Sequence, residues 1–213
     1  VRKRLIEDGV ALREKVKIAS VGKSASGVTV TLDGGERIEG SHLLVAAGRR
    51  ANLAGLALEK AGVALDGGKL VLDARLRTTN KRIYAAGDAA GGPQFTHLAG
   101  DHASTLVRNI LFKTPAKRRD ALCPRATYCD PEIAAVGLSE SEAKAADPST
   151  RVVKWSNKDN DRAQAERDTD GFIKVFAAKN GRILGATIAG RGAGELIALW
   201  SFAMANRLKI GAM

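Results

Sequence analysis

The sequence predicts a mixed fold, in which an α/β part is followed by an α+β part. Two observations support this prediction. Near the start, short and continuous apolar segments at Leu43–Ala47 and Ile83–Ala86 each run into a glycine, as strands covered on both faces often do. Nearer the end, the segments Gly171–Phe176 and Arg182–Ile188 flank Asn180-Gly181, the strongest short signal for an antiparallel hairpin.

Residues 1–48 are expected to form a short amphipathic helix and then a β-meander. Apolar and polar residues alternate at Val16–Ala19 and Val28–Leu32, as they do in half-buried strands. The glycine-rich turn Asp33–Gly35 follows the second of these segments. The apolar strand that closes this part stops at Gly48.

Residues 49–120 are expected to hold a buried strand, a loop and one long helix. The helix begins near Thr96, a residue type that is favoured at helix N-caps. Its buried face is predicted from the apolar residues that recur at three and four positions, namely Ala99, Ala103, Leu106 and Ile110. The helix ends before Thr114-Pro115, and the charged run Lys117–Asp120 is typical of a linker.

Residues 121–213 are expected to form an antiparallel sheet with helices packed on it. Ser139–Glu142 has the pattern of a capping box at a helix start, and Asp147-Pro148 stops that helix. A second helix is predicted over Ala193–Arg207. Its apolar face consists of Leu196, Trp200, Ala203 and Met204.

A candidate site lies where Ile83–Ala86 runs into Gly87 and Asp88. Open α/β sheets bind ligands at the carboxyl ends of their strands, and Gly87 has no Cβ to keep a ligand away from the backbone. An ionised Asp88 accepts hydrogen bonds only, so it suits a polyhydroxylated ligand better than a phosphate. The N–H groups that open the next helix suit a ligand edge that gains negative charge. An ordinary buried strand, an Asp-Gly turn and a helix fit the same spacing.

Three stretches resemble motifs of the pyridine nucleotide–disulfide oxidoreductases, in the order in which the family has them. Ile83–Ala103, with the sequence IYAAGDAAGGPQFTHLAGDHA, resembles the second FAD motif, and its PQFTH run is closest to the branch of mercuric reductases and dihydrolipoamide dehydrogenases. His42–Asn52 resembles the end of the NAD(P) domain, although Ala51 stands where the family usually has Pro. Pro124–Tyr128 and Asp130–Leu138 resemble the opening of the dimerisation domain.

The resemblance implies partial NAD(P)- and FAD-binding Rossmann-like pieces followed by an α+β interface, or dimerisation, domain. Residues 1–48 would be the C-terminal half of the NAD(P)-binding domain, and residues 49–120 the C-terminal part of the FAD-binding domain. Residues 121–213 would be the interface domain without its C-terminal end.

The resemblance also implies roles for individual residues. Asp88 would anchor the ribityl chain of FAD, and the N–H groups of Thr96 to Ala99 would stabilise the reduced flavin. Gly48 would let the nicotinamide cofactor pass close to the backbone, although a plain turn glycine fits equally well. His97 would border the flavin or cap the helix. The implied cofactor-binding residues are Gly48, Gly87, Asp88, Phe95, Thr96, His97, Leu98 and Ala99.

In this family NAD(P)H reduces FAD, and FAD passes electrons to a disulfide or a similar acceptor. The resemblance therefore implies a homodimeric parent protein of this kind, acting on a small-molecule or disulfide substrate. The chain lacks the family's two Gly-x-Gly-x-x-Gly turns, its pair of cysteines separated by four residues and its C-terminal active-site segment. We expect a C-terminal fragment that has no catalytic residues, is inactive alone and binds FAD weakly at most. The acceptor (lipoamide, glutathione, mercuric ion or quinone) stays open, as does NADH against NADPH.

Two other functions compete with this one. Residues 122–213 could act only as a dimerisation module that pairs with its own copy. The net charge of +11 would suit nucleic-acid binding, but the basic residues are spread among 23 acidic ones, 4% of residues are aromatic, and no nucleic-acid-binding motif occurs. A solvated basic surface is the preferred interpretation. Neither a membrane-length apolar run nor a signal peptide is recognised, so we expect a cytoplasmic protein without membrane contacts.

Three further patterns are not interpreted as sites. Gly190–Glu195 follows a strand and opens a helix, but its final glutamate is too large for a dinucleotide-binding turn. Cys123 and Cys129 have neither the family's redox spacing nor that of a metal pair, so two reduced thiols are expected. His97 and His102 lie five residues apart and do not share a helix face, so no metal site is predicted.

Overall fold

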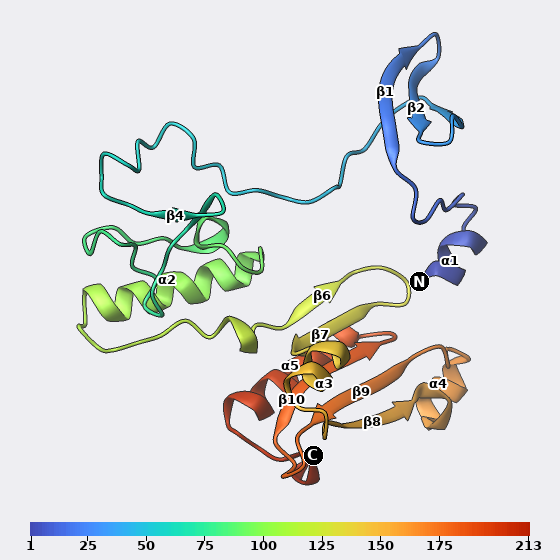
Figure 1. The fold of residues 1–213 in the computed structure, drawn as a ribbon. Helices are drawn as coiled ribbons and strands as arrows, with labels where there is room; N and C mark the ends of the chain where they lie inside the picture. Colours follow the sequence, from blue (N-terminus) through green and yellow to red (C-terminus); the bar gives the residue numbers. More distant parts are fainter. The chain divides into compact units, whose positions relative to one another are not determined.

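The computed structural model describes residues 1–213, and the chain divides into two compact units (Figure 1). One unit comprises Arg2–Arg50, and the other comprises Ala51–Met213 together with Val1. Antiparallel sheets and helices occur in both units, so the mixed fold class is confirmed. Each unit is described by itself below.

The smaller unit is a short helix followed by an antiparallel meander, as predicted, although the third strand of this meander, at Arg37–Gly40, was not predicted. Helix α1 spans Arg2–Glu7. Strands β1 (Ile18–Ser24), β2 (Gly27–Leu32) and β3 (Arg37–Gly40) pair antiparallel in sequence order. The first strand begins at Ile18 rather than Val16, a shift that is ordinary for element ends.

The strand predicted at Leu43–Ala47 is wrong. This segment has no regular secondary structure, and its side chains are open to solvent, with 89% of Leu44 and 73% of Val45 exposed. A strand needs a neighbour that satisfies its backbone N–H and C=O groups. No other segment of this chain pairs with it, so an apolar composition does not produce a strand here.

The first part of the larger unit contains one long helix and several short elements. Strands β4 (Leu65–Asp66) and β5 (Lys69–Leu70) form a small hairpin, and the 3₁₀ helix η1 spans Gly87–Ala90. Helix α2 follows at Thr96–Ile110 and the 3₁₀ helix η2 at Asp120–Leu122.

The strand predicted at Ile83–Ala86 is not formed, although the segment is partly buried. It forms one isolated bridge, between Arg77 and Tyr84, instead of a ladder. Ala85 is nevertheless buried and packs in a small core with Leu76. As at Leu43–Ala47, no neighbouring strand is present to pair with this segment.

Helix α2 begins within one residue of the prediction, but the predicted buried face is only half right. Ala99 is partly buried, and Leu106 packs against the small core of Leu76 and Ala85. Phe95 is the N-cap, and Thr96 is the first helical residue. Ala103 and Ile110, which belong to the predicted face, are exposed. The buried residues of the helix are Leu98, His102 and Thr105. Because two of these three are polar, an apolar periodicity does not find them.

The second part of the larger unit is a five-stranded antiparallel sheet with the order β6-β7-β10-β9-β8. Its strands are β6 (Arg125–Thr127), β7 (Ile133–Gly137), β8 (Arg151–Ser156), β9 (Phe172–Ala177) and β10 (Ile183–Ala189). The predicted hairpin is confirmed as β9–β10. Gly181 in its turn has a φ of +85°, a conformation that favours glycine.

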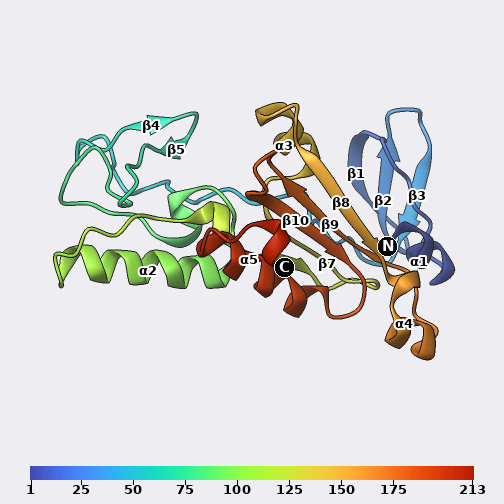
Figure 2. The same cartoon turned by 90° about the horizontal axis from the view of Figure 1, so that it is seen from below.

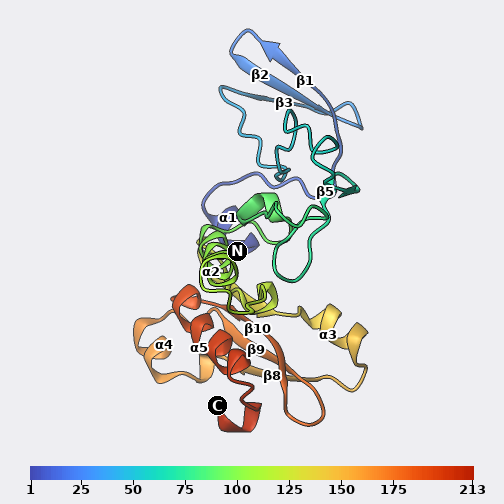
Figure 3. The same cartoon turned by 90° about the vertical axis from the view of Figure 1, so that its left-hand side faces the viewer.

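Helices α3 (Glu140–Ala146) and α5 (Ala193–Ala205) pack on opposite faces of this sheet (Figure 2, Figure 3). On one face, Ile197 of α5 packs in a core with Val136 and Ile188. On the other face, α3 covers Phe176. The remaining short helices are η3 (Asn157–Asp159), α4 (Asp161–Glu166) and η4 (Ile210–Ala212).

The capping box of α3 is confirmed. Glu142 N donates to Ser139 Oγ over 3.3 Å, and Ser139 N donates to Glu142 Oε2 over 2.8 Å. Asp147 ends the helix as predicted. Local sequence chemistry therefore determines both ends of this element.

Helix α5 carries apolar residues on all sides, so periodicity predicts its buried face only in part. Ala203 is buried and Trp200 and Met204 are partly buried, as predicted. Leu196, predicted on the same face, is 48% exposed, and Ile197 enters the core instead. The side chains left outside are Leu196, Leu199 and Phe202, termed here the α5 outer face.

Candidate functional site

The turn that contains Gly87 and Asp88 lies against the first turns of helix α2. Gly87 has a φ of +59°, a left-handed conformation that glycine adopts without steric strain. A Cβ at this position would meet the Cβ of Ala99 at 3.0 Å, which is tighter than ordinary van der Waals contact. The absent side chain therefore allows α2 to approach the turn closely.

Asp88 is exposed, and its carboxylate makes no hydrogen bond or ion pair with the chain. Its carbonyl oxygen accepts from the N–H of Gly91 over 3.2 Å, which closes η1. The backbone of Asp88 is thus fixed while its carboxylate stays available to a donor from outside. An ionised carboxylate accepts hydrogen bonds from hydroxyl groups.

His102 fastens this turn to α2, a role that the sequence did not reveal. The residue is completely buried, with 0% of its surface exposed. Gly87 N donates to His102 Nδ1 over 3.1 Å, and His102 Nε2 lies 3.1 Å from Asp120 Oδ1. The available signal was the helical spacing of Leu98, His102 and Thr105, which places a polar stripe on the buried face.

Asp120 is the second member of this buried network. Burial raises its pKa, but hydrogen bonds from His102 and from the Arg118 guanidinium outweigh that effect and hold the pKa below its usual range. The carboxylate is therefore ionised at neutral pH. Because Asp120 opens η2, the network joins three segments: the Gly87 turn, α2 and the charged run that the sequence identified as a linker.

The first turn of α2 retains backbone donors that no side chain caps. The N–H of Ala99 donates to the Phe95 carbonyl over 3.1 Å. The N–H groups of Thr96, His97 and Leu98 therefore have no partner within the helix. A helix start of this kind carries a partial positive charge and attracts a group with negative charge. Five of the predicted site residues, Phe95 to Ala99, thus lie at one helix end.

A hollow of about 520 Å³ adjoins the same helix end. The ring of His97 stacks on Phe95 with centroids 5.4 Å apart, and its Nε2 donates to the Pro124 carbonyl over 2.8 Å. The helix start is thereby anchored to the chain just before β6. The hollow is lined by Phe95, Thr96, His97, Pro124, Arg125, Ala126, Tyr128, Gly194 and Ile197.

Gly48 belongs to the smaller unit. It has a φ of +112°, and a Cβ placed on it would meet nothing within 4 Å. The backbone conformation by itself explains a glycine at this position. A contact between Gly48 and a nicotinamide cofactor stays a prediction.

The N-terminus of α5, where the glycine-rich segment Gly190–Glu195 lies, is capped from within the chain. Glu132 Oε2 accepts from Gly194 N over 3.1 Å, and the Glu132 carbonyl accepts from Gly190 N over 2.9 Å. A phosphate at this helix end would have to displace the carboxylate. The segment therefore acts as part of a structural cap.

Cys123 and Cys129 are free thiols. Burial raises the pKa of the Cys123 thiol, and the nearby Asp120 and Asp101 carboxylates raise it further, so this sulfur is a weak nucleophile at neutral pH. No three His, Cys, Asp or Glu side chains are arranged to hold a metal ion. None of the helices combines the length and apolar character that crossing a membrane requires.

Two protein-family models match the chain. The model described as "Pyridine nucleotide-disulphide oxidoreductase" matches residues 1–103. The model described as "Pyridine nucleotide-disulphide oxidoreductase, dimerisation domain" matches residues 123–213. The two models have the same order along the chain as the motifs found in the sequence.

Similar proteins include enzymes whose names give different substrates. A mercuric reductase from Streptomyces lividans is 33% identical over 209 residues, which are 96% of this chain and 44% of that protein. A dihydrolipoamide dehydrogenase from Chaetomium thermophilum is 35% identical over 211 residues, which are 96% of this chain and 42% of that protein. The crystal structure of LpdA from Mycobacterium tuberculosis matches 98% of this chain and 46% of its own, with 31% identity and a TM-score of 0.88. The chain thus spans less than half the length of these relatives.

Proposed function

Because the chain belongs to the pyridine nucleotide-disulphide oxidoreductase family, we propose that this protein passes electrons from NAD(P)H through FAD to a disulfide or similar acceptor. In this proposal, residues 1–48 belong to the NAD(P)-binding domain, residues 49–120 to the FAD-binding domain and residues 121–213 to the interface domain. The relatives' names differ in the substrate, mercuric ion in one and dihydrolipoamide in another, so the acceptor is proposed only as a class.

The observation that carries the proposal is that the free Asp88 carboxylate and the uncapped start of α2 occur in the same site. A flavin cofactor has a ribityl chain whose hydroxyl groups need acceptors and a ring edge that becomes more negative on reduction. The free carboxylate of Asp88 suits the hydroxyl groups. The uncapped N–H groups of Thr96, His97 and Leu98 suit the ring edge. The residues present therefore fit this group.

The chain's own contribution is to hold these groups in position, while bound FAD would supply the hydride and electron transfer. The turn before α2 is held by the bond from Gly87 N to His102 and by the close contact with Ala99. Asp120 and Arg118 complete the support behind His102. A site supported in this way reorganises little when a ligand binds.

The proposal is tested by comparing two aspartate variants of the complete natural protein. Asp88→Ala is expected to lower FAD affinity about tenfold or more, because a charged acceptor is lost. The melting temperature of the FAD-free protein should change little, since the Asp88 carboxylate has no partner in the chain. Asp66→Ala, which changes an exposed aspartate at the end of β4, is the matched control and should leave both quantities unchanged.

Flavin content and FAD affinity are measured by absorbance and fluorescence, and NAD(P)H oxidation is followed with lipoamide, mercuric ion or a quinone as acceptor. Equal FAD affinity in the two variants would contradict the role of Asp88. A complete protein that binds no flavin would contradict the whole proposal.

A second role, pairing with another copy of the chain, is favoured by the α5 outer face. Its members Leu196, Leu199 and Phe202 are 48%, 57% and 62% exposed, and they follow one another at three-residue spacing. They lie inside the segment that matches the dimerisation-domain model. We propose a homodimer in which this face is covered by a second copy, because large apolar side chains exposed together mark interaction surfaces.

A further inference from the structure

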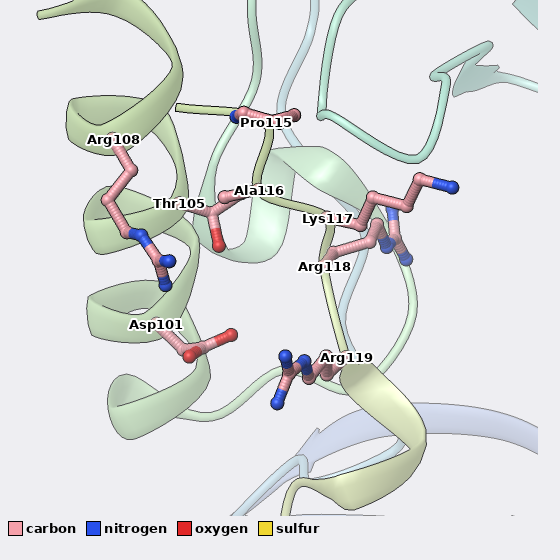
Figure 4. A pocket seen from close by; sticks show the side chains of 8 residues that line it. All are labelled: Asp101, Thr105, Arg108, Pro115, Ala116, Lys117, Arg118 and Arg119. Atoms are coloured by element: carbon pink, nitrogen blue, oxygen red, sulfur yellow. The ribbon is translucent and has the colours of Figure 1, made fainter. Parts of the chain in front are cut away.

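Helix α2 and the segment that follows it enclose a pocket of about 520 Å³ (Figure 4). Asp101, Thr105 and Arg108 line the pocket from α2, and residues 115–119 line it from the opposite side. The pocket lies along the helix, beyond the first turn that holds the proposed flavin groups. Of its lining residues, only Arg118 has a role in the proposed function, where it supports His102 through Asp120.

Both walls of this pocket are fixed by hydrogen bonds. Asn109 of α2 clamps Ala116 by accepting from its N–H and donating to its carbonyl, each over 2.9 Å. Arg118 N donates to the Ala74 carbonyl over 2.9 Å, and the Arg118 guanidinium donates to Asp120. A pocket whose walls are held in advance loses less conformational entropy on binding than a flexible one.

Thr105 has no hydrogen-bond partner that would explain its hydroxyl group. The residue is 6% exposed, and its side chain bonds to nothing in the chain. In Figure 4 the hydroxyl oxygen points into the space between α2 and residues 115–119. No side-chain nitrogen or oxygen that is sealed from solvent lacks a partner, so the Thr105 oxygen is open to the pocket and free to take a partner there. The pocket is the side from which a ligand atom would supply one.

The pocket is also rich in positive charge. Arg108 and Arg119 reach into it from opposite walls, and Lys117 extends from its rim (Figure 4). Asp101 is the one acidic residue in the lining, and no ion pair joins it to either arginine. Because Arg118 is already paired with Asp120, three cations against one carboxylate remain to attract an anion.

We propose that this pocket binds a phosphate monoester of a hydroxylated small molecule. Arg108 and Arg119 would hold the phosphate oxygens, since the planar guanidinium matches phosphate geometry with two parallel donors. The Thr105 hydroxyl would donate to a phosphate oxygen. Asp101, which only accepts hydrogen bonds when ionised, would bind a hydroxyl group of the same ligand.

The first test measures binding of ribose 5-phosphate, inorganic phosphate and ribose to the purified protein by isothermal titration calorimetry. We expect saturable binding of ribose 5-phosphate at one site, weaker binding of inorganic phosphate and no binding of ribose. Absence of saturable binding by both phosphate compounds would overturn the proposal. So would binding of a single-stranded oligonucleotide without binding of either phosphate compound.

The second test uses variants with a matched control. Thr105→Val and Arg119→Gln should each weaken ribose 5-phosphate binding about tenfold, because each removes a hydrogen bond to a charged group. Arg151→Gln makes the same change of charge at an exposed arginine of β8 and should leave affinity unaltered. Equal weakening by Arg119→Gln and Arg151→Gln would show a general charge effect and overturn the site.

Thermal melting separates binding from folding in these variants. Because the Thr105 hydroxyl has no partner, its replacement by a methyl group should leave the melting temperature of the free protein unchanged or slightly raised. A lowered melting temperature together with unchanged ligand affinity would show that the hydroxyl is structural and would overturn its assigned role.

Asp101→Asn tests whether the ligand carries hydroxyl groups. Loss of the negative charge should strengthen inorganic phosphate binding by removing repulsion. The same change should weaken ribose 5-phosphate binding relative to inorganic phosphate, because an amide is a poorer acceptor than a carboxylate. Equal strengthening for both compounds would overturn the assignment of a hydroxylated ligand.

Discussion

His102 is the side chain on which the geometry of the candidate flavin site depends. A backbone N–H can only donate, so the bond from Gly87 identifies Nδ1 as an acceptor. Nε2 then carries the hydrogen and donates to the Asp120 carboxylate. One neutral ring thereby satisfies a buried backbone donor on one side and a charged group on the other. Asp120 also accepts from Arg118, but no other side chain accepts from the Gly87 N–H, so His102 is a positioning group for the turn.

His102→Leu is expected to lower the free energy of unfolding by about 3 kcal/mol, because it leaves the Gly87 N–H and the Asp120 carboxylate short of a partner. His97→Leu is the control. His97 is exposed and makes one hydrogen bond, so its loss should cost less than about 1 kcal/mol. Urea unfolding measures both. Equal effects of the two substitutions would show that the buried network does not support the turn.

Asp120 makes the stability that the network contributes depend on pH. The pKa of this carboxyl is lowered in the folded state, so its contribution to stability is present above the usual pKa of an unfolded aspartate and is lost as the pH falls through the folded value. Asp120→Asn removes the charge at all pH values. We expect the wild-type protein to be more stable than this variant by about 2 kcal/mol near neutral pH, with the difference shrinking below about pH 4. Chemical unfolding at a series of pH values measures the difference, and a difference that does not vary with pH would count against an ionised Asp120.

At the scale of elements, the structure agrees with the sequence wherever the deciding interactions are local. The capping box needs Ser139 and Glu142 alone, and the β9–β10 turn needs Gly181 in a left-handed conformation. Both were predictable because the interacting groups lie within a few residues of one another.

The elements that could not be predicted depend on partners distant in the sequence. Leu43–Ala47 has the composition of a strand but finds no neighbour in this chain. The buried face of α2 was misjudged because His102 and Thr105 are buried as polar groups, one in a network and the other beside a pocket. In α5, apolar residues on every side left Leu196 and Ile197 equally suited to the core. Asp88 and the start of α2 were predictable as a candidate site, whereas the support behind them was not.

The packing of η1 on α2 can be tested with glycine substitutions. Gly87→Ala should lower the free energy of unfolding by about 1 kcal/mol for its left-handed conformation and by a further 1 kcal/mol or so for the contact with Ala99. Gly67→Ala is the control, because Gly67 has a similar φ of +53° and open space around a built Cβ. Gly67→Ala should lower the free energy of unfolding only by the contribution of the left-handed conformation.

Combining Gly87→Ala with Ala99→Gly should recover the contact part, so a double-mutant cycle is expected to give a coupling energy of about 1 kcal/mol. A coupling energy near zero would show that α2 does not press on the turn in solution. FAD affinity of the same variants would then report how far the closeness of turn and helix matters for the proposed cofactor.

At the scale of the whole molecule, two groups of exposed apolar side chains in the larger unit can be compared as interaction surfaces. One follows the end of α2, where Leu111 and Phe112 are 70% and 71% exposed. The other is the α5 outer face. Only the second lies on a regular helix, and the opposite side of that helix is anchored in the sheet core by Ile197 and Ala203. A rigid apolar helix face can meet its own copy across a two-fold axis, so that each residue contributes twice to one interface.

Phe202→Asp is therefore expected to raise the dissociation constant of the proposed dimer at least about a hundredfold. Burial of one phenylalanine side chain contributes about 2 kcal/mol, and the symmetry of the interface doubles this loss. Phe112→Asp makes the same substitution at a phenylalanine that is even more exposed and lies outside residues 122–213, and it should leave the dimer intact. Sedimentation equilibrium over a range of concentrations measures both variants against the parent protein. A parent protein that stays monomeric at high concentration would refute the pairing, and dissociation by Phe112→Asp with retention by Phe202→Asp would move the interface from α5 to the end of α2.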